Sequence, residues 1–119
     1  MPEIKLPPQA QQLLVQLQTF QQHLQAVLLQ KESLTIQKVE IEKALEELDK
    51  AKEGEDVYKA IGPILIKSGK DTMQKELKEK NETNELRLKS LGRQENKIKE
   101  KAKETQDKLQ TFFKPSAAD

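Results

Sequence analysis

A seven-residue repeat of apolar side chains is the feature that most limits how this chain can fold. One position of the repeat is apolar in five consecutive heptads, at Phe20, Val27, Leu34, Ile41 and Leu48. The other position holds Leu17, Leu24, Lys31, Lys38 and Leu45. A repeat sustained over this length is typical of a coiled coil rather than of an ordinary surface helix. We therefore expect a long helix over residues 8–52.

Lys31 and Lys38 interrupt this apolar repeat. A buried polar residue at such a position can fix the register of a coiled coil, at a cost in stability. In the other interpretation, which we favour, each lysine lays its aliphatic part along a narrow two-helix seam and places its ammonium group in water.

A second patterned segment, expected to be a helix over residues 70–113, follows a less regular repeat. Its register runs through Leu77, Asn81, Asn84, Leu88, Leu91, Glu95, Ile98, Ala102, Thr105, Leu109 and Phe112. Leu86 falls outside that register, and Gly92 lies in mid-helix. Because the two patterned segments have similar lengths and a short connector, we expect the chain to fold back as an antiparallel coiled-coil hairpin.

The connector, residues 56–67, is predicted to be a β-hairpin. Two runs rich in β-branched and other apolar residues flank Gly62-Pro63, and glycine at the first central position suits a type II′ turn. An isolated two-stranded hairpin is marginally stable at best, and both of its edges are unpaired. We therefore expect an obligate oligomer in which several such hairpins pair into a shared sheet or barrel. The residues expected to make this contact are Val57, Tyr58, Ile61, Ile64, Leu65 and Ile66.

Boundary residues agree with this layout. Pro7 and Pro8 suit the start of the first helix. Gly54 is suited to closing that helix, and Ser68, three residues before Asp71, resembles a capping box that opens the second helix. The expected fold class is mainly α, a long antiparallel two-helix coiled coil with one β-hairpin at its closed end. We take residues 1–119 as a single domain with flexible segments at 1–7 and 114–119.

Composition narrows the function. Apolar residues make up only 34% of the chain, which is little for a compact core, but their periodicity and the net charge of +1 argue against disorder. With no cysteine, one histidine and no Gly-rich phosphate loop, we expect no metal, cofactor or catalytic site. The charge balance disfavours nucleic-acid binding, and no apolar run approaches the ~20 residues of a membrane span. Without a secretory signal, a cytoplasmic protein is expected.

Five segments carry a resemblance to a known family: Pro8–Gln12, Lys43–Leu48, Val57–Lys67, Glu76–Lys80 and Arg87–Glu95. In order and spacing they resemble the beta-type subunits of prefoldin, over nearly the whole chain. A single hairpin between the helices points to the beta class, since alpha-type subunits carry two, and the short termini resemble the archaeal form. Pro63 departs from the pattern, because a non-proline residue is common there.

This resemblance implies a hexamer of two alpha-type and four beta-type subunits. Their hairpins would form a β-barrel body from which six coiled coils project. The implied function is that of a chaperone without ATP, which holds non-native polypeptides between the coiled-coil tips and hands them to a group II chaperonin. A structural or tethering coiled-coil protein without chaperone activity is the alternative.

Apolar residues at the open end of the predicted hairpin offer a physical basis for such holding, because exposed apolar patches mark interaction sites. The candidate contacts with client or chaperonin are Ile4, Leu6, Leu13, Leu14, Leu109, Phe112 and Phe113. In the alternative interpretation these residues only complete the seam. We favour that alternative for Leu13, Leu109 and Phe112, and contact for Ile4, Leu6 and Phe113.

Overall fold

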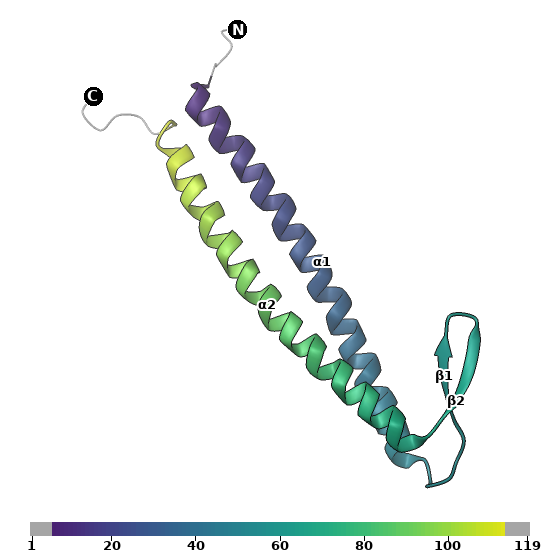
Figure 1. Ribbon diagram of the computed structural model, residues 1–119. Coiled ribbons are helices and arrows are strands. Elements are labelled where there is room, and N and C mark those ends of the chain that lie inside the picture. Colours follow the sequence, from purple (N-terminus) through teal and green to yellow (C-terminus); the bar gives the residue numbers. More distant parts are fainter. Residues whose placement is uncertain (1–5, 114–119) are drawn as a thin grey trace. The chain divides into compact units, whose positions relative to one another are not determined.

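The computed structural model describes residues 6–113 and contains two long helices with a β-hairpin between them (Figure 1). In chain order the elements are α1 (Pro8–Lys50), β1 (Val57–Ile61), β2 (Ile64–Ser68) and α2 (Lys70–Gln110). The expected fold class, two antiparallel long helices with one hairpin, is confirmed. The described residues form two compact units, one made of residues 6–30 and 91–113 and the other of residues 31–90.

The start of α1 follows from its two prolines. The carbonyl of Pro7 accepts the first intrahelical bond, from the amide of Gln11 at 3.0 Å. Pro8 takes the first helical position, where an amide hydrogen would have no partner within the helix. The Gln11 side chain also donates to the carbonyl of Leu6 at 3.0 Å. The predicted helix start is therefore confirmed.

The first unit pairs the N-terminal part of α1 with the C-terminal part of α2. Ala10 and Val27 of α1 and Leu91 and Leu109 of α2 are buried in it. Polar residues also occupy the predicted register of α2 here, and each has a local partner. Buried Thr105 donates its hydroxyl to the carbonyl of Lys101 at 2.8 Å, which satisfies the group without a partner from α1.

Hydrogen bonds between α1 and α2 in the second unit show that the two helices run in opposite directions. The amide of Asn84 donates to Gln37 at 3.2 Å, and Gln74 donates to Asp49 at 2.8 Å. As the residue number rises along α1, its partner's number falls along α2, so the two helices run antiparallel.

The apolar repeat of α1 packs as predicted in this unit. Leu34, Ile41 and Leu48 are buried, while Lys38 is partly exposed. The Lys38 ammonium lies 3.9 Å from a carboxylate oxygen of Glu85, and both side chains reach solvent. This geometry supports the interpretation in which Lys38 extends from the seam to water.

The helix ends differ from the sequence predictions in detail. α1 ends at Lys50 rather than at residue 52, and Gly54, with a φ of 86°, lies in the following turn where the Glu55 amide bonds to the Lys52 carbonyl. The prediction that Gly54 closes α1 is therefore wrong. The ammonium of Lys70 donates to the carbonyl of Ala51 at 2.8 Å and so satisfies an acceptor just beyond the helix.

The start of α2 also corrects a prediction. Ser68 belongs to β2 and pairs with Val57, so it does not cap the helix. Gly69 takes the cap position, because its carbonyl accepts the first intrahelical bond from Met73 at 3.0 Å. At its other end α2 finishes at Gln110, and residues 111–113 continue in tighter turns.

The expected flexible segments at residues 1–7 and 114–119 lie outside the described residues, apart from residues 6 and 7. The assignment of residues 1–119 to a single domain stays a prediction.

Candidate functional site

The β-hairpin is built on a tight two-residue turn. Ile61 pairs with Ile64, which leaves Gly62 and Pro63 as the loop. Gly62 has a φ of 54°, and no non-glycine residue between 6 and 113 has a positive φ. A type I′ turn would need a positive φ at both loop positions, so the φ values agree with the type II′ turn that glycine at the first position suits.

The register of the hairpin sorts its side chains onto two faces. Directly paired residues point to the same face of an antiparallel ladder, and neighbours along a strand alternate. One face therefore carries Val57, Lys59, Ile61, Ile64, Ile66 and Ser68, and the other carries Tyr58, Ala60, Leu65 and Lys67. Both faces are thus rich in apolar side chains, and neither is a polar face that could rest in water.

The apolar residues of the hairpin are mostly exposed. Leu65 is 71% exposed, Ile64 56% and Tyr58 55%, and only Val57 among the predicted contact residues is partly buried. Each strand pairs with the other alone within residues 6–113, so the outer edge of each is free. Free edges together with exposed apolar side chains on both faces are what a strand-pairing interface requires. The contacts themselves stay a prediction.

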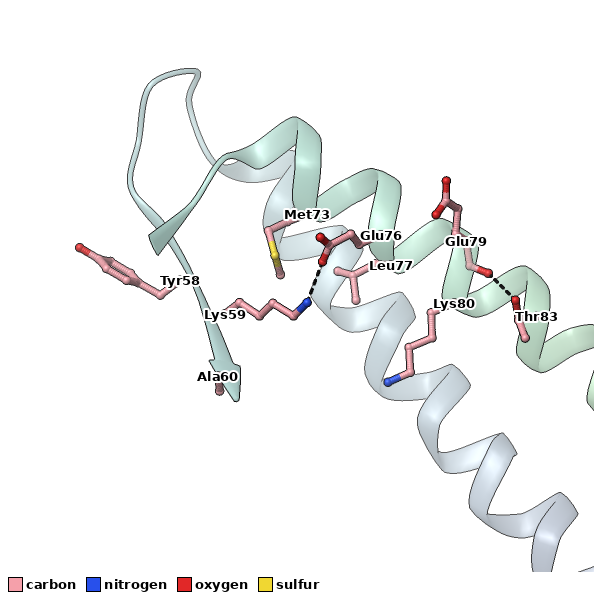
Figure 2. A pocket seen from close by; sticks show the side chains of 9 residues that line it. All are labelled: Tyr58, Lys59, Ala60, Met73, Glu76, Leu77, Glu79, Lys80 and Thr83. Carbon is pink, nitrogen blue, oxygen red and sulfur yellow. Dashed lines mark hydrogen bonds and ion pairs between the residues drawn. The ribbon is translucent and has the colours of Figure 1, made fainter. Parts of the chain in front are cut away.

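An ion pair ties the hairpin to the first turns of α2. The Lys59 ammonium lies 3.0 Å from a carboxylate oxygen of Glu76 (Figure 2). Lys59 and Glu76 also line a shallow groove of about 580 Å³ between β1 and α2, together with Met73 and Leu77. Thr83, at the far side of the groove, donates its hydroxyl to the Glu79 carbonyl at 3.1 Å.

The predicted contact residues at the helix ends divide into two groups. Leu109 is buried, and Leu6, Leu13 and Leu14 are partly buried. Phe112 and Phe113 are exposed, by 38% and 57%. Ile4 lies outside the described residues. Burial of Leu109 agrees with a role in the seam, whereas Phe113 is available for a partner; contact with a client stays a prediction for all seven.

The sequence predictions missed a second set of exposed apolar residues, on α1 itself. Val15, Leu28, Leu29, Ile36 and Val39 lie off the heptad seam and are each more than 40% exposed. For Val15, Leu28 and Leu29 a signal was present in the sequence: residues 6–30 contain no Asp, Glu, Lys or Arg. The positions between the seam residues of this stretch are rich in glutamine, which predicts a solvated, uncharged helix face but not its exposed apolar residues.

Between residues 6 and 113 no three His, Cys, Asp or Glu side chains gather closely enough to hold a metal ion. No helix of that region has the length and apolar content needed to cross a bilayer. The candidate sites on the described residues are the exposed apolar surfaces of the hairpin and of the helices.

Comparisons with known proteins identify relatives over nearly the whole chain. The family model described as prefoldin subunit matches residues 11–116. The chain is 50% identical over 113 residues to a prefoldin subunit beta from Archaeoglobus fulgidus, covering 95% of this chain and 97% of that protein. It is 46% identical over 112 residues to the corresponding protein from Thermococcus onnurineus, covering 94% of this chain and 97% of that one.

A solved structure matches the fold as well. The crystal structure of the prefoldin beta subunit from Thermococcus strain KS-1 aligns with a TM-score of 0.82 at 42% identity. The alignment covers 94% of this chain and 98% of that one. The resemblance that the sequence motifs carried is thus confirmed, beta class included.

Proposed function

The chain belongs to the prefoldin subunit family, and on that premise we propose that it holds non-native polypeptides without ATP and passes them to a group II chaperonin. As a member of this family it is a chaperone subunit that assembles with other prefoldin subunits. The assembly we propose contains two alpha-type and four beta-type subunits, with this chain in the beta positions, and works in the cytoplasm.

The observation that supports the assembly best is the uncovered hairpin. Its side chains are apolar on both faces, its outer edges are free, and Leu65 is 71% exposed. Burying apolar surface is worth about 25 cal/mol per Å², so neighbouring hairpins gain stability by covering one another. Pairing of the free edges adds hydrogen bonds and defines the geometry. A closed barrel of hairpins satisfies both needs, because a barrel has no free edge.

The proposed client contacts are at the other end of the helices. Exposed Phe112 and Phe113 follow the end of α2, and partly buried Leu13 and Leu14 lie in the first turns of α1. Apolar side chains presented at an end can contact apolar segments that a folded client would hide. Such contacts need no nucleotide, because binding and release are set by the client's exposed apolar surface.

The test measures assembly of the complex first and then its effect on client aggregation. Native mass spectrometry of this chain, mixed with an alpha-type partner, should show a complex of two alpha-type and four beta-type chains. Light scattering should then show that this complex slows aggregation of a chemically denatured model protein at near-equimolar ratio, equally with and without ATP. A group II chaperonin added with ATP should recover folded client. Normal aggregation in the presence of the complex would contradict the proposal and favour a structural or tethering protein.

A further inference from the structure

The outward side of α1 in the first unit exposes apolar side chains away from the seam. Val15 is 61% exposed, Leu29 59% and Leu28 44%. Val15 lies in a shallow groove of about 650 Å³ whose lining residues all come from the start of α1: Pro8, Gln11, Gln12, Val15 and Gln16. We call the surface made by Val15, Leu28, Leu29 and the exposed glutamines Gln11, Gln18, Gln22 and Gln25 the amide face.

The amide face differs from its partner helix in charge. Residues 6–30 contain no Asp, Glu, Lys or Arg, whereas half of residues 91–110, the part of α2 in the same unit, are charged. A helix that served only to keep the unit in solution would carry charges on its outer side, as α2 does. The outer side of α1 instead presents apolar carbon and uncharged amides. A partner bearing charges would lose hydration here and gain no counter-charge, so an uncharged partner fits best.

The pattern of the amide face does not suit a second helix. Val15 and Leu29 are two heptads apart, and Gln22 occupies the equivalent position between them. Gln18 and Gln25 fill the neighbouring column. A helical partner needs apolar residues repeated in every heptad in two columns, so that knobs enter holes. Neither column meets that condition, which argues against a further copy of the coiled coil docking here.

The chemistry does suit an unfolded chain. Each residue of an unfolded polypeptide other than proline exposes one amide donor and one carbonyl acceptor, beside scattered apolar side chains. A glutamine amide both donates and accepts, whereas lysine only donates and an ionised glutamate only accepts. Thr19, in the same stretch of α1, donates its hydroxyl to the Val15 carbonyl at 3.0 Å. The side-chain amides therefore supply most of the donors, and they can meet a client backbone in many registers.

We propose that the amide face binds uncharged, apolar segments of unfolded polypeptide in addition to the contacts at the helix ends. The inference rests on the proposed holding function and deepens it, because it assigns client contact to the side of α1 and not to α2. Val15, Leu28 and Leu29 provide apolar contacts, and the glutamines between them bind the client backbone.

The test uses the complete complex with its alpha-type partner. The variant Val15→Gln/Leu28→Gln/Leu29→Gln keeps the charge, does not lower helix propensity and removes the exposed apolar groups. It should require about tenfold more complex for half-suppression of client aggregation, because losing part of three apolar contacts costs about one factor of ten. Native mass spectrometry should show an unchanged complex, and circular dichroism unchanged helicity.

Leu86→Gln provides the matched control. Leu86 is 67% exposed, but it lies on α2 beside charged residues such as Glu85 and Arg87. It should leave suppression within about twofold of the unaltered complex, as for an ordinary surface substitution. A further variant, Gln18→Glu/Gln22→Glu/Gln25→Glu, should weaken capture of apolar client while leaving every apolar side chain in place.

Three results would overturn the inference. Full suppression by the Val15/Leu28/Leu29 variant would show that clients do not use this face. Disassembly of that variant's complex would assign the face to contact between subunits. An equal loss in Leu86→Gln would show that any exposed apolar residue suffices. If the unaltered complex fails to slow aggregation, the proposed function itself is wrong, and this outcome is distinct from failure of the variant alone.

Discussion

The hairpin and the amide face both expose apolar side chains, but on different kinds of backbone. On the hairpin, exposed Ile64, Leu65 and Ile66 are carried by strands whose outer edges are free. On α1, exposed Val15 and Leu29 are carried by a helix whose backbone hydrogen bonds are internal. Free edges impose a register on a partner, whereas the amide face, which has no column that is apolar in every heptad, does not. The first surface is therefore suited to one fixed partner, and the second to many.

The largest effect should come from charging the hairpin. Ile64→Asp/Ile66→Asp places two carboxylates on one face of β2, where assembly would have to bury them unpaired. We expect native mass spectrometry to show no hexamer and only free subunits. Circular dichroism should show that the helices remain. Retention of the complex would contradict the assignment of the hairpin as the surface for one fixed partner.

The turn can be tested separately from the faces. Gly62 has a φ of 54°, so Gly62→Ala should destabilise the hairpin by roughly 1–2 kcal/mol, the cost of a left-handed conformation in an L-residue. Gly92→Ala is the control: Gly92 is helical and has open space around it, so the change should stabilise the protein by about 1 kcal/mol. Thermal unfolding of both variants measures the difference. Equal shifts of the same sign would contradict this account of the turn.

An effect of similar size is expected at the polar pair between the helices. Asn84 is 4% exposed and donates to Gln37. Asn84→Ala leaves Gln37 without that partner and should cost roughly 1–2 kcal/mol. Asn84→Leu/Gln37→Leu should recover that loss but loosen the register, since a polar pair at one seam position specifies alignment. Chemical denaturation measures the first effect, and cross-linking between α1 and α2 measures the second. An unchanged stability in Asn84→Ala would show that the pair contributes nothing.

The smallest effect should be that of Lys59 and Glu76. Their side chains are 44% and 47% exposed, so the pair should contribute at most about 1 kcal/mol, less at high salt. A double-mutant cycle with Lys59→Met and Glu76→Gln measures the coupling. A coupling free energy well above that value would mean that the ion pair fixes the orientation of the hairpin relative to α2. The hairpin would then be a rigid interface.

Periodicity predicted the packing of the helices well. In α2 every register position from Leu77 to Leu109 is buried or partly buried, and Leu86, outside the register, is exposed. The reason is that a helix facing one partner has a seam whose position depends only on residue spacing. Phe112 is the exception, since it follows the last turn of α2 and is 38% exposed.

Local signals were less reliable at the connections. Gly54 and Ser68 matched helix-end patterns, yet Gly54 lies in a separate turn and Ser68 pairs with Val57 in the hairpin. Each of these residue types occurs in several local structures. Ser68 is in a strand because the ladder extends as far as its pairing with Val57, and the identity of a single residue does not predict how far a ladder extends.

The two heptad helices, the hairpin between them and the turn at Gly62 follow from the amino-acid sequence, because residue spacing and glycine conformation act locally or along one face of a helix. Which apolar residues remain uncovered follows instead from how the two helices pack. Exposure of Val15 and Leu29 depends on which side of α1 the partner helix occupies. That side is set by the packing of both helices together. Residues 6–30 are uncharged in the sequence, but the position of the seam shows which of their side chains are exposed.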